Sequence, residues 1–125
     1  MRQGKITAAY KAVLGLYGMK GLPLKTSKEL FFLKRDLEPY VEWQQAQEQK
    51  AQEENSSGLD EMGAYIMTPA DRKAVVERFK EIQDTEVEWN RDPVQIRLSD
   101  EQAAALGVTG KWIDQLDGFV EFMEE

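Results

Sequence analysis

The sequence predicts an α+β protein that is mostly helical, with about five helices and a small antiparallel sheet of two or three strands. Three observations predict this class. Apolar residues recur every three or four positions over long stretches, several segments open with helix-capping patterns, and two short segments near residue 90 alternate between apolar and polar side chains. The chain has 125 residues, a length that predicts a single domain spanning 1–125.

A first helix is predicted from about Lys5 to Tyr17. Its apolar residues follow a helical spacing and form one stripe: Ile6, Ala9, Tyr10, Val13, Leu14 and Tyr17. Gly18 and Gly21 follow the stripe. They are expected to end the helix, because glycine weakens helices and favours their C-terminal caps.

A second helix is predicted to begin at a capping box in which Thr26 and Glu29 satisfy each other's free amide groups. Its expected buried stripe consists of Leu30, Phe31, Leu33, Leu37, Tyr40 and Val41. Pro39 lies inside this stripe, where it removes one backbone hydrogen bond and clashes with the carbonyl of Arg35. The sequence therefore predicts a long helix that is kinked at Pro39 or broken into two helices there.

The chain becomes polar over residues 42–58, which are predicted to form a protruding helix end and a loop. Gln, Glu, Lys and Ala favour helix here, but few apolar residues are available to bury a face. Two interpretations stay open, a solvated helix end or a helix that pairs with a partner. The candidate interface residues are Trp43, Gln44, Gln47, Glu48 and Lys50. Trp43 either anchors this interface or shields the Pro39 kink.

A third helix is predicted from Thr68 to Asp84, after a candidate short strand at Ala64–Met67. Thr68 suits the N-cap, Pro69 suits the first helical position, and Asp71 suits the positive first turn. These signals together place the helix start at Thr68.

The sheet is predicted in the last third of the chain. Apolar and polar side chains alternate over residues 86–89 and again over residues 94–98, as expected of half-buried strands. Residues 90–93 read as a turn between them. The two segments are therefore predicted to form an antiparallel pair.

Two further helices are predicted after these strands. Ser99 and Gln102 form a capping box for a short helix that Gly107 ends. Thr109 then opens a last helix, whose apolar face comprises Trp112, Ile113, Leu116, Phe119 and Val120. Its acidic tail, residues 121–125, is unfavourable at the negative end of a helix and suits fraying or a cationic partner.

Basic and acidic residues are unevenly distributed along the chain. Residues 1–40 hold eight Lys or Arg and three Asp or Glu, whereas residues 41–125 hold eight and twenty, so that the formal net charge is −7. A candidate basic patch comprises Lys5, Lys11, Lys28, Lys34 and Arg35. Two outcomes are open: the opposite charges pair within the fold, or they lie on opposite surfaces and orient copies against each other.

The missing residue types limit the chemistry. The chain has no Cys and no His, which excludes disulfides, thiolate chemistry, and the commonest general base and zinc ligand. Two acidic rows at helical spacing suit either a divalent cation or a solvated helix face: Asp114, Asp117 and Glu121, and Glu77, Glu81 and Asp84. No cofactor is predicted, and no apolar run reaches the length of a membrane span.

Several motifs along the chain carry a family resemblance. Residues 22–25, Leu-Pro-Leu-Lys, open a long helix with a charged tail, and the segment 93–99 precedes a Leu-rich C-terminal helix. In these features the chain resembles small uncharacterised proteins encoded by tailed phages and prophages of Gram-positive bacteria. The resemblance covers most of the chain. It implies a phage gene product from the morphogenesis or tail region, and it implies no catalytic residues.

The sequence favours a non-enzymatic protein-interaction or assembly protein of phage or prophage origin, with another protein or a second copy as partner. One alternative is a nucleic-acid-associated regulator that uses the basic N-terminal helices and a hairpin over residues 86–98. The negative net charge of the chain disfavours this alternative, because phosphate groups repel it. A second alternative is an enzyme that uses carboxylates and a divalent metal ion. No membrane contact is expected. The expected location is the host-cell cytoplasm, or the virion if a phage encodes the chain.

Overall fold

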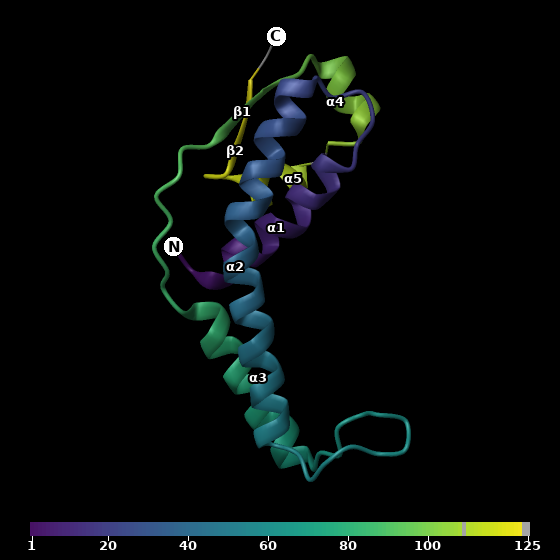
Figure 1. Cartoon of the computed structure of the whole chain (residues 1–125), viewed down its shortest axis with the longest axis vertical. Coiled ribbons are helices and arrows are strands. Elements are labelled where there is room, and N and C mark those ends of the chain that lie inside the picture. The colour runs from purple at the N-terminus through teal and green to yellow at the C-terminus, as the bar shows by residue number, and fades with distance from the viewer. Residues whose placement is uncertain (109, 124–125) are drawn as a thin grey trace.

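One long helix sets the arrangement of the chain, and the other elements attach to it (Figure 1). The computed structural model describes residues 1–108 and 110–123. Within them the elements follow in the order α1 (Gln3–Tyr17), α2 (Leu24–Glu54), α3 (Pro69–Asp84), β1 (Val94–Arg97), α4 (Asp100–Leu106), α5 (Gly110–Leu116) and β2 (Val120–Met123). The prediction of a mostly helical chain with about five helices is confirmed for these residues.

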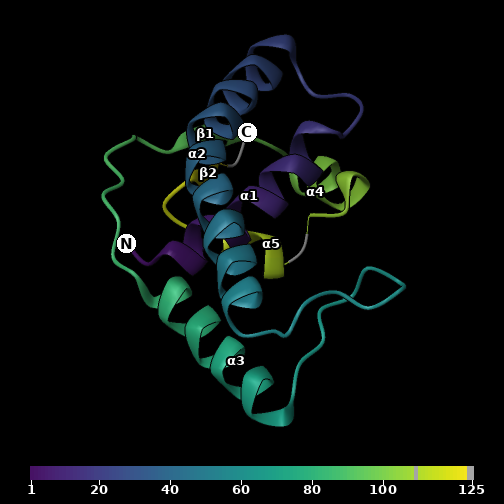
Figure 2. The ribbon, with the colours of Figure 1, turned by 60° about the horizontal axis from the view of Figure 1, so that its bottom comes forward.

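Helix α2 contacts different elements along its two halves. Helix α1 crosses its N-terminal half obliquely, and the strands lie beside the same half (Figure 1). Helix α3 runs along the C-terminal half, which therefore packs on another helix of its own chain (Figure 2). The loop between α2 and α3 projects from the far end of this helix pair in both views.

The core lies where α1, the N-terminal half of α2, α5 and the two strands meet. It comprises Ile6, Ala9, Ala12, Val13, Leu16, Leu30, Leu33, Leu37, Val94, Ile96, Leu116, Phe119 and Val120. The ring of Trp89 packs against this cluster, with its centroid 5.7 Å from that of Tyr40 and 5.4 Å from that of Phe119. Burial of such a continuous apolar cluster is the main force that stabilises a fold of this size.

Helix α1 buries a face that differs from the predicted one. The helix begins at Gln3, and its buried residues are Gln3, Ile6, Ala9, Ala12, Val13 and Leu16. Leu14 and Tyr17, which were predicted to be buried, are 39% and 40% exposed. The buried face is therefore shifted around the helix axis, and it includes the polar residue Gln3.

Helix α2 begins earlier than predicted and is not broken by Pro39. Its first residue is Leu24, and no side-chain hydrogen bond caps it, so the predicted capping box of Thr26 and Glu29 is wrong. The helix continues for 31 residues through Pro39. The alternative of two separate helices is therefore wrong. Tertiary packing along both halves outweighs the one backbone bond that proline removes.

The starts of α3 and α4 are confirmed by their side-chain caps. Thr68 and Asp71 form a reciprocal capping box at α3, with proline at the first helical position. Ser99 and Gln102 do the same at α4, which ends at Gly107 in a left-handed conformation. Local sequence signals therefore set both helix starts.

The segment 86–89 does not form the predicted strand, because it pairs with the start of the chain. The amide of Val87 donates to the carbonyl of Met1 (2.8 Å). One antiparallel bridge joins Arg2 to Glu86. This pairing holds the extended segment beside the start of α1 and leaves β1 without its predicted partner.

The sheet is parallel, and the predicted antiparallel sheet of two or three strands is wrong. In the described part of the chain, β1 pairs with β2 in a register that joins Val94 to Val120. Gly118 allows the turn that leads into β2. Its backbone has a φ of 85°, a left-handed conformation that glycine adopts without strain. The chain therefore leaves the helix before Gly118 and turns into β2.

Helix α5 is consequently shorter than the predicted last helix. Its predicted first residue, Thr109, lies outside the described residues, as do residues 124–125 of the predicted acidic tail. Of the predicted apolar face, Leu116, Phe119 and Val120 are buried, whereas Ile113 is 51% exposed. The last two buried residues of that face belong to the turn and to β2, not to a helix.

Candidate interaction surfaces

The five residues of the predicted interface lie on the C-terminal half of α2 and differ in their exposure. Gln44 has only 5% of its surface exposed, whereas Trp43 is 41% exposed. Gln47 and Glu48 are half-buried, and Lys50 is exposed. The structure therefore does not unite these residues in one exposed surface.

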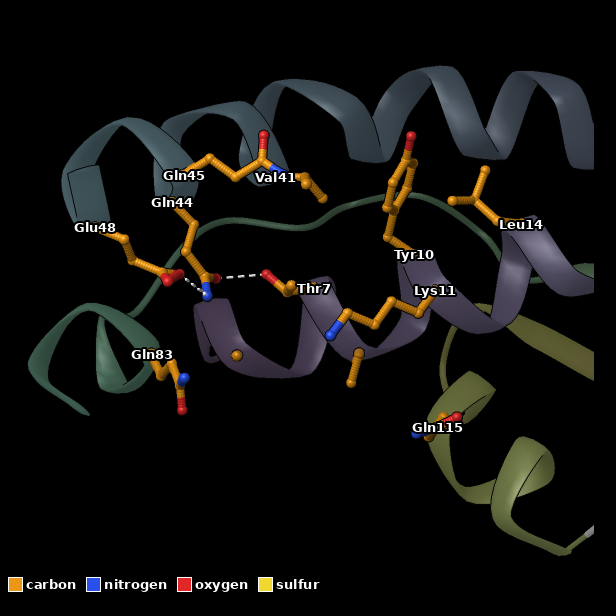
Figure 3. A pocket seen from close by; sticks show the side chains of 12 residues that line it. Thr7, Tyr10, Lys11, Leu14, Val41, Gln44, Gln45, Glu48, Gln83 and Gln115 are labelled. Atoms are coloured by element: carbon orange, nitrogen blue, oxygen red, sulfur yellow. Dashed lines mark hydrogen bonds between the residues drawn. The ribbon is translucent and has the colours of Figure 1, made fainter. Parts of the chain in front are cut away.

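Gln44 belongs to a buried hydrogen-bond network between α1 and α2 (Figure 3). The Nε2 of Gln3 donates to the carbonyl of Tyr40 (2.7 Å) and to the Oε1 of Gln44 (3.2 Å). The hydroxyl of Thr7 donates to the same Oε1. The Nε2 of Gln44 in turn donates to Glu48 (2.8 Å). Satisfied polar groups in a core specify which faces pack together, so Gln44 fixes α1 against α2.

A groove of about 620 Å³ lies beside this network, between α1 and α2 (Figure 3). The small residues Gly4 and Ala8 of α1 form part of its lining, and α3 and α5 each contribute one glutamine. Its polar side chains are Thr7, Lys11, Gln44, Gln45, Glu48, Gln83 and Gln115. Amide groups both donate and accept hydrogen bonds. The groove can therefore hydrogen-bond a polar group.

Trp43 lines a smaller hollow of about 310 Å³, together with Pro39, Tyr40 and Val87. A helical side chain leans over the turn that precedes it, which places the indole beside the proline four residues earlier. This position agrees with the interpretation that Trp43 shields Pro39. Gln3 also lines the hollow, and its Oε1 is a buried acceptor without a donor among the described residues.

The residues of the predicted basic patch have separate surroundings. Lys11 lines the α1–α2 groove. Lys5 lies six positions earlier on α1, which places it about 240° away around the helix axis. Lys28 and Arg35 are exposed and lie seven positions apart, on one face of α2. The structure thus brings Lys28 and Arg35 to a common face and leaves Lys5 and Lys11 on another helix.

Lys34, the fifth of these residues, has a carboxylate partner. It donates to Glu38 (2.6 Å), and its ammonium lies 5.9 Å from the centroid of the Phe31 ring. The hydrogen bond to Glu38 raises the pKa of Lys34 above its usual value. As far as the charge of Lys34 is concerned, the stabilisation is fully present below the ordinary pKa of lysine and is lost as the pH rises through the raised pKa.

Most basic residues of the first third have no carboxylate partner in the described structure. Of the eight Lys and Arg in residues 1–40, Arg2 and Lys34 form ion pairs with described carboxylates. A further pair, between Asp36 and Arg91, joins the two parts of the chain. The uneven charge distribution is thus mainly a feature of the surface.

The two acidic rows do not form a metal site. Helix α5 ends before Asp117, so that Asp114, Asp117 and Glu121 do not share a helix face. In the other row, Glu81 pairs with Arg78 at 2.9 Å. Over residues 1–108 and 110–123, no three acidic side chains come together in a way that could hold a metal ion. The geometry therefore gives no support to divalent-metal chemistry.

A small hairpin projects from the loop between α2 and α3 (Figures 1 and 2). We call residues 57–66 the arm. The amide of Ile66 donates to the carbonyl of Gly58 (2.9 Å), and one antiparallel bridge joins Leu59 to Tyr65. The short strand predicted at residues 64–67 is reduced to this bridge.

The tip of the arm is ordered and apolar. The Oδ1 of Asp60 accepts from the amides of Met62 (2.8 Å) and Ala64 (3.0 Å), which is the geometry by which Asp stabilises a turn. Around this turn Leu59, Met62 and Ile66 are 60%, 91% and 47% exposed. The backbone thus holds three apolar side chains in solvent.

A second exposed apolar surface lies at the N-terminal end of α2. We call Leu24, Lys28, Phe31 and Phe32 the aromatic stripe, because they recur at the spacing of one helix face. The three apolar members are 86%, 37% and 42% exposed. The ring of Tyr17 lies 6.2 Å from that of Phe31, which lies 5.5 Å from that of Phe32. The stripe is therefore continuous with the exposed end of α1.

Neither exposed surface was identified from the sequence. The sequence predicts a buried Phe31, but this residue is 37% exposed and Leu30 is fully buried. Adjacent helical residues point about 100° apart, so Leu30, Phe31 and Phe32 cannot all face one core. The angular spacing of these three residues is the sequence signal that indicates an exposed aromatic side chain here. For the arm, the signal was Asp60 before Met62 and Gly63, a turn pattern with an apolar residue at its tip.

Comparison with protein-family models, with curated proteins and with solved structures gives no match. None of the helices described is long and apolar enough to cross a membrane. A function for this chain is therefore argued from its own surfaces.

Proposed function

We propose that the chain is a non-enzymatic protein-interaction or assembly protein, and that its arm binds another protein. The observation that carries this proposal is the exposure of Met62, a large apolar side chain that is 91% exposed at the tip of an ordered projection. Large apolar side chains that a fold holds in solvent are candidate interaction sites. Leu59 and Ile66 are also exposed, on the two flanks of the arm.

The order of the arm supports a binding role. Its turn is held by the two hydrogen bonds to Asp60 and by the bridge between Leu59 and Tyr65. Binding by a preformed hairpin loses less conformational entropy than binding by a flexible loop. The apolar side chains of the arm would therefore contribute more of their burial energy to affinity.

The alternatives have less support from the geometry. A nucleic-acid-binding regulator would need its basic residues on one face, and Lys5 and Lys11 lie on a different helix from Lys28 and Arg35. It would also need the wing-like hairpin over residues 86–98, which does not form. An interaction protein requires neither feature.

The proposal includes the cellular setting. We place the chain in the host-cell cytoplasm, or in the virion if a phage encodes it. The resemblance to tailed-phage proteins stays a prediction, which the neighbouring genes test. A position among capsid and tail genes would support it, whereas a position among metabolic genes would contradict it.

A photo-crosslinking amino acid in place of Met62 tests the role of the arm, in cells that naturally express the chain. We expect discrete adducts of higher mass, because the tip would lie against the partner. The matched control carries the same amino acid in place of Val76, an apolar residue of α3 that is 67% exposed. No adduct at position 62, or equal adducts at both positions, would contradict the proposal.

A further inference from the structure

We propose that the partner of the arm is a second copy of this chain, and that the arm docks on the aromatic stripe of that copy. This inference rests on the proposed function, because it identifies the protein that the arm binds. Both surfaces are exposed, apolar and ordered by the fold, and they lie at opposite ends of α2 (Figure 1).

The length of α2 makes the contact intermolecular. The stripe occupies the first turns of the helix, and the arm follows its last turn. A continuous helix of 31 residues spans about 45 Å. The arm therefore does not reach the stripe of its own chain. Arm-to-stripe contacts between identical copies either pair reciprocally in a closed two-fold dimer or run head to tail, in which case they close into a ring or extend as a filament.

The side chains of the two surfaces are complementary in kind. The stripe presents two phenylalanine rings, and Leu24 extends the apolar surface toward the helix start. The arm presents Met62, whose flexible thioether packs well against aromatic rings. Apolar burial supplies most of the free energy of protein association. The ring pair and the methionine tip are thus the centre of the proposed contact.

The charges around the two surfaces are complementary as well. Lys25, Lys28 and Arg35 are exposed on the N-terminal half of α2, whereas Glu53, Asp60 and Glu61 are exposed at its last turn and in the arm. Lys28 lies within the stripe, and Glu61 lies beside Met62 in the arm. Neither side chain has an ion-pair partner among the described residues. A second copy supplies the missing partner of each, which argues for this occupant over an unrelated protein.

A charge swap measured by sedimentation velocity on the purified chain tests this pairing. Glu61→Lys or Lys28→Glu alone places like charges opposite each other, and each is expected to raise the dissociation constant of self-association about tenfold or more. Both substitutions together restore opposite charges and are expected to return the constant to within about threefold of wild type. Met62→Ser is expected to weaken association about tenfold or more, because it removes the apolar tip.

Two control variants make the same charge changes elsewhere. Lys80→Glu and Glu77→Lys alter exposed residues of α3 and are expected to leave the dissociation constant within about twofold of wild type. Circular dichroism of every variant checks that the helices are retained. If the controls weaken association as much as the swaps do, a general effect of net charge explains the data and the inference fails.

The remaining outcomes separate this inference from the proposed function. A photo-crosslinked adduct at position 62 that contains two copies of the 14.3 kDa chain supports both. A wild-type chain that stays monomeric up to millimolar concentration overturns the inference. If position 62 then crosslinks to a different protein, the proposed function stands without it. If position 62 gives no adduct at all, both fail. If the dissociation constant of the double variant does not return toward the wild-type value, the pairing of the arm with the stripe is overturned.

Discussion

Gly15 illustrates how a single residue controls the packing of α1. A Cβ atom at this position would lie 2.8 Å from the Cη2 atom and 3.0 Å from the Cζ2 atom of the Trp112 indole. The first distance is shorter than real contacts allow, and the second is tighter than most of them. The indole of α5 therefore occupies space that any other residue at position 15 would fill, and glycine permits the two helices to approach.

We expect Gly15→Ala to destabilise the fold. The new methyl group forces Trp112 or α5 to move, at a cost of about 1–3 kcal/mol, whereas replacing a helical glycine by alanine gains only about 1 kcal/mol. The sign of the change is measured by urea unfolding. Gly110→Ala, where the added Cβ meets open space, is the control and should not lower stability. A Gly15→Ala variant that is more stable than wild type would show that the indole does not rest on Gly15.

At the scale of elements, the sequence predicts local features well and long-range pairing poorly. The caps of α3 and α4 depend on side chains three residues apart, such as Thr68 and Asp71, and both are confirmed. The partner of β1 depends on Gly118, far along the chain, and on the start of the chain, which occupies segment 86–89. Hydrophobic periodicity is evaluated within one segment at a time, so it predicts neither of these long-range effects.

An engineered disulfide tests the register of the parallel strands. The chain has no cysteine, so Gln95→Cys with Glu121→Cys creates the only thiol pair. These positions face each other in the sheet, within the distance range of a disulfide. We expect nearly complete oxidation in air, read by thiol titration and mass spectrometry. The comparison pair is Gln95→Cys with Glu88→Cys, which an antiparallel hairpin would join. Faster bridging of that pair would contradict the parallel sheet.

The same contrast explains how much of the candidate surfaces could be predicted. The existence of a polar segment after Val41 follows from composition, and so does its helical start. Its docking on α3 depends on tertiary contacts, and the folded segment buries Ala51 but leaves Trp43 41% exposed. The arm and the stripe are defined by exposure in the folded chain, which no local pattern contains.

At the scale of the whole molecule, the uneven charge distribution is a property of the surface. The side-chain pairs that join the first 40 residues to the rest, such as Arg2 with Asp84 and Asp36 with Arg91, are few and partly exposed. Exposed ion pairs contribute only about 0–1 kcal/mol each. The charges therefore have little influence on folding and more influence on association.

We expect salt to separate these two properties. Raising sodium chloride to about 0.5 M shortens the screening length to a few ångströms. The free energy of unfolding should then change by less than about 1 kcal/mol, whereas self-association should weaken clearly. Chemical denaturation and sedimentation at matched salt concentrations give the two quantities. A stability that falls in step with association would mean that the opposite charges act mainly within the fold.

The continuous helix α2 has a geometric consequence for any assembly that uses both of its ends. The number of residues in this helix sets the repeat distance between neighbouring copies and their relative rotation, since each residue adds about 1.5 Å and 100°. Seven added residues would lengthen the repeat by about 10 Å and nearly preserve the rotation. A single added residue would scarcely change the repeat but would turn the arm by more than a quarter circle. Chain length and helical phase would thus determine whether copies form a closed ring or an open filament.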